Sequence, residues 1–246
     1  MQMFYHVRVK KKYLYAFLMG VLLLLLAYFI NEQVLQHAFQ ASPLDAIYGI
    51  DTRENMLVFT FEAAAGEDYI EEILGVLSRY GIRALFFVTG HWLEENRELA
   101  AKLAAKHEVG SHTYSHPRLL DQNNDELARE FERFQELFED VFGEDEELRY
   151  FRPPFGEFDE RTLALAGEKG QKVVLWSIES QDWMASSLDR HIDDLLQKIH
   201  PGGIVAFRAG SKETVMTLPL FIQSVWKEGY QIVPLDWAID EYGGAF

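Results

Sequence analysis

The sequence contains no cysteine among its 246 residues. This absence excludes disulfide bonds, thiolate metal sites and a cysteine nucleophile, and it is compatible with either side of a membrane. Positive charge is also scarce, because 23 Lys and Arg residues face 39 Asp and Glu residues, which gives a net charge of −16. We therefore expect no nucleic-acid partner, and no tight contact with an anionic membrane surface apart from the basic N-terminus.

A glycine-rich phosphate-binding loop is missing too. Residues 62–66 follow the first strand-like run and read Glu-Ala-Ala-Ala-Gly, which lacks the glycine spacing that such a loop needs. This disfavours a dinucleotide-binding fold. The remaining composition, with 48% hydrophobic and 25% charged residues, is ordinary for a globular protein. About 200 residues follow the N-terminal segment, enough for one α/β domain.

The N-terminal segment predicts a membrane anchor. Residues 13–30 form an uncharged apolar run, and Arg8 and Lys10 to Lys12 precede it. A helix that crosses a bilayer needs roughly 17–25 such residues, and the positive flank favours the cytoplasmic side. We expect a cytoplasmic tail over 1–12, a transmembrane helix over 13–30, a stalk over 31–50 and an extracytoplasmic domain over 51–246. A cleaved signal peptide is the alternative, although residues 38–41 miss the usual small-x-small spacing.

Strand and helix patterns alternate from residue 56 onward, which predicts an α/β domain with about seven parallel strands in an open sheet or a barrel. The carboxyl ends of parallel strands meet on one face, where the chemistry of such folds lies. Expected strands are 56–61, 84–88, 107–111, 150–152, 173–178, 204–207 and 231–235, and expected helices are 67–80, 93–106, 125–142, 159–168, 188–199 and 218–228.

Two histidines follow the third expected strand, in the segment GSHTYSHP of residues 110–117. The spacing of His112 and His116 lets both imidazoles point at one metal ion. A pair of solvated loop histidines is the plain alternative. Carboxylates, arginines and aromatic side chains follow the other strands, a combination that suits metal-assisted hydrolysis beside an aromatic-edged groove for a sugar-like substrate. For Arg152 and Asp182 the alternative is a buried ion pair, and for Trp92 and Trp183 it is packing.

The ordered segments resemble the motifs of the polysaccharide deacetylase family, also called chitooligosaccharide deacetylase-like or carbohydrate esterase family 4. The best matches are GSHTYSH and RPPFG, supported by SxDW over 180–183 and the ALFF run over 84–87. The resemblance covers residues 56–235 and implies a distorted (β/α)7 barrel, here preceded by one N-terminal transmembrane helix. The anchor and the TFEAAAG segment are most similar to the cell-wall and sporulation branch of Gram-positive bacteria.

The resemblance also implies residue roles. His112 and His116 match two ligands of a divalent metal (Zn, Co or Mn), and the third ligand stays open between Glu62, Glu67 and Asp68. Phe155 matches the residue whose backbone N–H binds the oxyanion. The catalytic set that the resemblance implies is Glu62 as base, Arg152 as its positioning partner, Phe155, Glu179, Asp182 and Arg208, and the substrate-contacting set is Trp183, Pro154 and Trp92.

Several positions depart from the family pattern. Glu62 replaces the usual Asp base, Ala63 replaces the usual metal-binding Asp, and Arg208 replaces the usual general-acid histidine. An arginine cannot act as that acid, because its pKa is above about 12. Three hypotheses follow: a membrane-anchored deacetylase of N-acetylated glycans such as peptidoglycan or chitooligosaccharides, a catalytically impaired pseudoenzyme that binds glycan or a protein, and a regulatory sporulation protein that uses the barrel as a scaffold.

Overall fold

The computed structural model describes residues 46–64, 69–181 and 187–243, which lie within one compact unit, Pro43–Phe246. The expected anchor over 13–30, Glu67, Asp68, Asp182 and Trp183 lie outside the described residues. Among the helices that are described, none has the length and apolarity needed to cross a bilayer.

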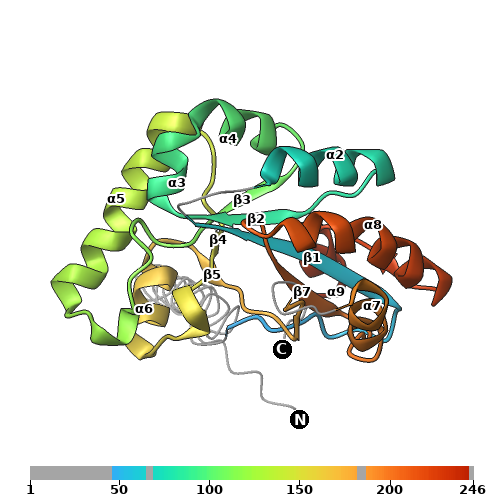
Figure 1. The fold of residues 1–246 in the computed structure, drawn as a ribbon. Helices are drawn as coiled ribbons and strands as arrows, with labels where there is room; N and C mark the ends of the chain where they lie inside the picture. Colours follow the sequence, from blue (N-terminus) through green and yellow to red (C-terminus); the bar gives the residue numbers. More distant parts are fainter. Residues whose placement is uncertain (1–45, 65–68, 182–186, 244–246) are drawn as a thin grey trace, which may run out of the picture. The chain divides into compact units, whose positions relative to one another are not determined.

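The described strands form one parallel sheet in the order β5-β4-β3-β2-β1-β7-β6, and β8 pairs with the first residues of β1. The sheet curves into an α/β half-barrel (Figure 1). The strands are β1 Met56–Ala63, β2 Leu85–Val88, β3 Glu108–Ser111, β4 Tyr150–Phe151, β5 Lys172–Val173, β6 Ile178–Glu179, β7 Gly203–Arg208 and β8 Gln231–Ile232.

The helices α2, α4 and α8 lie on the outer side of the sheet (Figure 1), whereas Leu235 and Ala238 of α9 belong to the cluster on the concave side. The helix α7 packs on α8, α8 on α2, and α5 contacts α3, α4 and α6. Short 3-10 turns occupy Leu119–Asp121 and Pro154–Gly156. The helices are α2 Ile70–Tyr80, α3 Gly90–Glu95, α4 Arg97–Ala104, α5 Asn124–Phe142, α6 Glu160–Glu168, α7 Leu188–Leu196, α8 Lys212–Lys227 and α9 Leu235–Tyr242.

The strand β1 is buried on both faces, and its alternate residues face two different cores. Leu57, Phe59 and Phe61 belong to the large cluster between sheet and helices, whereas Met56 and Val58 belong to the cluster on the concave side. Since side chains alternate along a strand, Thr60 and Glu62 continue the concave row. The pattern therefore aims Glu62 into the barrel interior at the carboxyl end of the strand.

The chain between β5 and β6 joins the two ends of the sheet. The sequence predicts one strand over 173–178, but the structure contains two short strands separated by residues 174–177. β5 pairs with β4 at one edge, and β6 pairs with β7 at the other. The segment before β1 also contributes, because Ile47 bridges to Val174 and Gly49 bridges to Gly203. The segment 172–179 thus contributes one strand to each edge of the sheet, whereas the sequence pattern predicts one strand there.

Candidate active site

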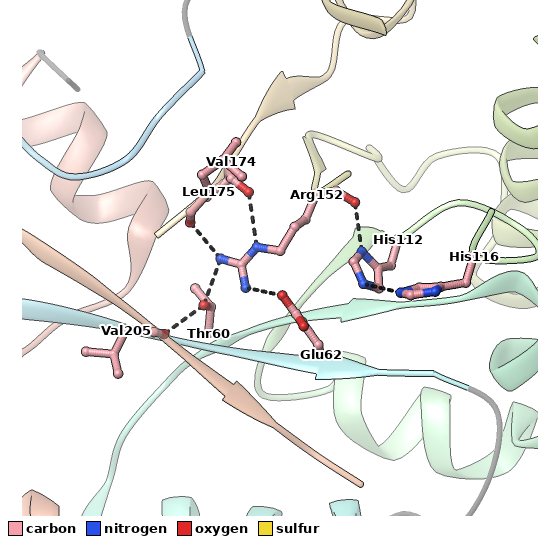
Figure 2. A network of polar contacts seen from close by, with 8 residues as sticks. All are labelled: Thr60, Glu62, His112, His116, Arg152, Val174, Leu175 and Val205. Carbon is pink, nitrogen blue, oxygen red and sulfur yellow. Dashed lines mark hydrogen bonds and ion pairs between the residues drawn. The ribbon is translucent and has the colours of Figure 1, made fainter. Parts of the chain in front are cut away.

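Expected site residues in and after the strands β1, β3 and β4 meet at one end of the sheet. Glu62 lies at the end of β1, in register with Phe87 of β2 and Arg208 of β7. His112 follows β3 and Arg152 follows β4, and Figure 2 shows these side chains pointing toward one another. The carboxyl ends of the strands thus bring together Glu62, His112, His116 and Arg152.

The guanidinium of Arg152 is the centre of the polar network, and the residue is 0% exposed. Its Nε donates to Val174 O at 3.1 Å, and its Nη2 donates to Thr60 Oγ1 and Leu175 O, both at 2.8 Å. Its Nη1 lies 3.4 Å from Glu62 Oε1 (Figure 2). Burial lowers the pKa of Arg152 to about 10, while Glu62 opposes this shift. Arg152 therefore stays charged at neutral pH and holds the Glu62 carboxylate.

The backbone of Arg152 fixes the tautomer of His112. The Nδ1 atom of His112 lies 2.8 Å from the carbonyl oxygen of Arg152. A carbonyl only accepts hydrogen bonds, so Nδ1 carries the proton and Nε2 keeps its lone pair. Burial lowers the pKa of His112 to about 4, although Glu62 opposes this shift. The imidazole is therefore neutral at pH 7, with a lone pair available for a metal ion.

The second histidine places its ring nitrogen beside the first. His116 Nε2 lies 3.1 Å from His112 Nε2 (Figure 2). Two nitrogens bound to a tetrahedral zinc ion at about 2.0–2.1 Å lie roughly 3.3 Å apart. Burial lowers the pKa of His116, and Arg208 contributes in the same direction against Glu62. The histidine pair therefore has the spacing and the neutral state of two metal ligands.

A third protein ligand is not assembled among the described residues. They contain no group of three or more His, Cys, Asp or Glu side chains arranged for a metal ion. Glu62 affects the pKa of both histidines, so its carboxylate is the described acid that faces the pair. Because the pair offers two imidazole ligands and Glu62 one carboxylate, the donor types fit a divalent ion. The other expected candidates, Glu67 and Asp68, lie outside the described residues.

The loops around the site adopt unusual backbone conformations. The positive-φ residues other than glycine in the described chain are Thr113, His116, Phe155 and Gln181, with φ between 54° and 64°. All four lie in loops that leave the carboxyl ends of β3, β4 and β6. Such conformations cost on the order of 1–3 kcal/mol each and gather at functional sites. Their common location supports a functional role for this end of the sheet.

The RPPFG segment places an aromatic ring at the mouth of the site. Pro154 is buried, whereas Phe155 is 57% exposed. The Phe155 ring lies 4.8 Å from the His116 ring, edge to face, and the Arg118 guanidinium lies 5.6 Å from the Phe155 ring centre. Arg118 also pairs with Glu157, two residues beyond Phe155. These contacts join the loop that carries His116 to the loop that carries Phe155.

The remaining expected residues fall into three groups. Glu179 ends β6 and accepts a hydrogen bond from Gln181 at 3.1 Å, and Arg208 is exposed at the end of β7. Asp182 and Trp183 are not among the described residues. Trp92 is 1% exposed and belongs to the core beneath α3, and an indole so buried cannot contact a glycan. This burial corrects the expected role of Trp92 and favours its packing alternative.

Some residues that shape the site were not expected from the sequence. Thr60 accepts from Arg152 and donates to Val205 O at 2.8 Å, and the carbonyls of Val174 and Leu175 also bind Arg152. The position of Thr60, two residues before Glu62 on the same strand face, is a signal that could have revealed it. The backbone carbonyls have no sequence signal, because any residue carries one.

A cavity of about 400 Å³ lies at the other end of the sheet. Its polar lining includes Arg83, His107, Glu108 and Arg149, around the starts of β3 and β4, with apolar side chains of α5 opposite. It contains none of the residues at the carboxyl ends of the strands. The cavity is therefore separate from the histidine pair.

Comparisons with known proteins agree with this geometry. Residues 49–174 match the model of the polysaccharide deacetylase family. An uncharacterised 30.6 kDa protein of Geobacillus stearothermophilus is 31% identical over 78% of this chain and 73% of its own length. The peptidoglycan-N-acetylmuramic acid deacetylase PdaA of Bacillus subtilis is 28% identical over 78% of this chain and 74% of its own.

A solved structure shares the fold. It is a wild-type pseudoenzyme of the CE4 family from Bacillus anthracis, with a TM-score of 0.76 and 28% identity, covering 82% of this chain and 70% of that one. A mutant of that pseudoenzyme with restored enzymatic activity superposes with the same TM-score of 0.76. The resemblance to the family that the sequence motifs indicated is thereby confirmed.

Proposed function

Since this chain belongs to the polysaccharide deacetylase family, we propose that it removes N-acetyl groups from a cell-wall glycan such as peptidoglycan by metal-assisted hydrolysis. The observation that carries the proposal is the histidine pair, whose Nε2 atoms lie 3.1 Å apart while the carbonyl of Arg152 orients His112. PdaA, a peptidoglycan-N-acetylmuramic acid deacetylase, is 28% identical over 78% of this chain.

Each side chain at the strand ends has a role that its surroundings support. His112 and His116 would hold the divalent ion, with Glu62 or an acid of the following loop as the third ligand. When bound, the ion supplies Lewis-acid polarisation of the acetamide carbonyl and lowers the pKa of water. Glu62 accepts the proton of the attacking water, and Arg152 orients its carboxylate from 3.4 Å. The backbone N–H of Phe155 binds the oxyanion.

Arg208 sets the chemistry of this chain apart from the family pattern. It ends β7 in register with Glu62 and lowers the pKa of His116. Its guanidinium does not give up a proton at neutral pH, so the leaving amine takes its proton from water or from Glu62. The positive charge of Arg208 instead stabilises an anion in the cleft. We expect turnover to be roughly 10²–10⁴-fold slower than with an acid in this position.

The test is acetate release from peptidoglycan and chitooligosaccharides by the purified protein with Zn²⁺, Co²⁺ or Mn²⁺. We expect slow release that disappears when His112 and His116 are both replaced by Ala. His200→Ala is the matched control, because His200 lies before β7 and bonds Ser177 at 3.0 Å. A complete lack of acetate release with all three metals contradicts the proposal.

A specific set of observations favours a second function, that of a pseudoenzyme that binds glycan without hydrolysing it. The described residues assemble no three-ligand group, Ala63 cannot ligate a metal, and Arg208 replaces the expected acid. The neighbouring pseudoenzyme of Bacillus anthracis shows that such members exist in the family. This function requires glycan binding by a protein that binds no zinc tightly, and loss of that binding in Trp183→Ala.

The place of action is part of the proposal. The apolar run over 13–30, with basic residues before it, supports a single-pass anchor with the family domain outside the cytoplasm. A cell-wall glycan is accessible only on that side. The similarity to PdaA supports the cell wall as the setting.

A further inference from the structure

The loop that carries His116 depends on contacts from outside it. Thr113 and His116 both adopt left-handed backbone conformations, with φ of 64° and 60°. Neither is a glycine, so each conformation is disfavoured on its own and persists only where the surroundings impose it. Any residue that fastens this loop therefore helps to decide where the His116 ring points.

One side of the loop is fastened by its own residues and by the start of α3. Thr113 Oγ1 accepts from the backbone N–H of His116 at 3.0 Å. The backbone N–H groups of Gly90 and His91 donate to the carbonyls of Thr113 and Tyr114, at 3.0 and 3.1 Å. These contacts involve Thr113, Tyr114 and the N–H of His116, and they leave the N–H and hydroxyl of Ser115 to other partners.

Glu130 of α5 fastens the other side through Ser115, the residue directly before His116. The backbone N–H of Ser115 donates to Glu130 Oε2 at 2.7 Å, and its hydroxyl donates to Glu130 Oε1 at 2.7 Å. Both carboxylate oxygens thus bind one residue, at distances typical of strong charge-assisted hydrogen bonds. Two bonds to one partner fix orientation as well as distance, so Ser115, the residue from which the chain enters His116, has little freedom to move.

The helix that carries Glu130 is a rigid support. Leu127, Phe131 and Phe134 of α5 are buried. At the start of the helix, Asn123 and Glu126 form a capping box. A second residue of α5, Arg133, stacks its guanidinium 3.6 Å from the centre of the Tyr114 ring. The helix α5 therefore supports the loop that carries His116, in addition to presenting polar side chains to solvent.

We propose that Glu130 is a positioning residue that preorganises His116 as a metal ligand. The inference rests on the proposed function, because it takes the histidine pair as the metal-binding edge. Glu130 acts through Ser115 and does not itself contact the metal or the substrate. The hydrogen bonds between Ser115 and Glu130 connect residues 15 positions apart in the chain.

The test compares three variants of the full-length protein: Glu130→Ala, Glu130→Gln and the control Glu132→Ala, which changes an exposed acid on the same helix. Zinc affinity is measured by competition with a chromophoric chelator, and amide hydrogen exchange is measured at Ser115 and His116 by NMR. We expect Glu130→Ala to weaken zinc binding about tenfold or more and to speed exchange at both amides by a similar factor. Glu130→Gln keeps an oxygen acceptor for the Ser115 N–H and should restore most of both.

The two measurements separate this inference from the function on which it rests. A wild-type protein that binds no zinc contradicts the proposed function, and the exchange rates then still decide whether Glu130 orders the loop. Exchange and zinc affinity in Glu130→Ala that equal those of Glu132→Ala overturn the inference. Loss in Glu130→Gln as large as in Glu130→Ala also overturns it, because charge and not hydrogen-bond geometry would then be responsible.

Discussion

At the scale of single residues, the buried positive charge of Arg152 organises the site. Burying a guanidinium is costly unless its donors are satisfied, and Arg152 satisfies them with three acceptors besides Glu62. These acceptors come from β1 and from the segment between β5 and β6. Arg152 therefore ties the two ends of the curved sheet to its centre while it orients the carboxylate that faces the histidines.

Replacing Arg152 by Lys tests this role, because it keeps the charge and removes the forked geometry. A single ammonium group cannot reach Val174 O, Thr60 Oγ1 and Glu62 together. We expect a loss of roughly 3–5 kcal/mol in the free energy of unfolding, measured by urea denaturation. Arg97→Lys, which changes an exposed arginine paired with Asp140, should alter it by less than about 0.5 kcal/mol. Equal effects of the two changes would contradict a structural role for the buried network.

The residue after Glu62 offers a second test. Ala63 is 1% exposed and belongs to the cluster between sheet and helices. A carboxylate introduced there is buried and costs on the order of a few kcal/mol unless the end of β1 turns it toward the histidines and a cation binds it. We expect Ala63→Asp to lower the melting temperature without metal and to show a larger zinc-induced rise than the wild type, because a ligand that binds only the folded state stabilises it. Calorimetry with and without zinc checks this.

Activity completes this second test. Adding Arg208→His to Ala63→Asp supplies a group that can act as an acid near neutral pH. The double variant should release acetate at least tenfold faster than wild type. A zinc response of Ala63→Asp no larger than that of wild type would show that position 63 cannot reach the metal.

At the scale of elements, a cluster of charges joins β3 to α9. Arg83 Nη2 donates to Glu108 Oε1 at 3.0 Å and forms an ion pair with Asp236 Oδ2 at 3.2 Å, and Arg149 lies 4.0 Å from Asp236. Burial, together with Asp236, raises the pKa of Glu108 to about 8, while the arginines oppose this shift. Glu108 is therefore mostly protonated at pH 7.

This cluster makes stability depend on pH. The folded-state pKa of Glu108, about 8, lies above its ordinary value of 4.5, so the folded protein binds more protons than the unfolded chain between these pH values. The contribution of Glu108 to stability is complete below about pH 4.5 and is lost as pH rises toward 8, by on the order of a few kcal/mol. Glu108→Gln should flatten that part of the curve of unfolding free energy against pH. Glu98→Gln, an exposed change on α4, should leave the curve as in wild type, and a wild-type curve in Glu108→Gln would contradict the assignment.

The same scale shows what local sequence can and cannot predict. The helix over 125–142 is confirmed almost to the residue, because its apolar spacing and its cap are local signals. The helix expected over 93–106 is two helices, because Asn96 leaves helical geometry and its side chain donates to Trp92 O. The helix α9 was missed although Pro234 before it and Gly243 after it are local boundary signals. The division between β5 and β6 was missed because it follows from pairing with distant strands.

The candidate site also contains residues that the sequence predicts and residues that it does not. The histidine pair, Arg152 and Glu62 are recognisable from residue type and their place after strands. The double hydrogen bond from Ser115 to Glu130, the left-handed conformation of Phe155 and the burial of Trp92 are tertiary properties. No spacing in the sequence encodes them, because a tryptophan at a helix start fits a groove and a core equally well.

At the scale of the whole molecule, the residues before the apolar run are basic, whereas the chain as a whole is acidic. The net charge is −16, yet Arg8 and Lys10 to Lys12 stand directly before the apolar run over 13–30. An acidic domain gains nothing from an anionic membrane surface, so the membrane attachment that we propose depends on burial of that run. A charge placed within the run should therefore remove the attachment while leaving the family domain unchanged.

The full chain with Leu24→Arg and Leu25→Arg tests this expectation. Each arginine at the centre of a spanning helix costs about 2.5–3.5 kcal/mol on insertion scales. We expect wild type to stay with membranes after carbonate extraction and the variant to appear in the soluble fraction. The control Leu24→Ile with Leu25→Ile should behave as wild type.

Mass measurement of the purified wild-type protein decides between an anchor, which keeps residues 13–30, and a signal peptide, which loses them. Recovery of a shortened wild-type protein in the soluble fraction would contradict the anchor.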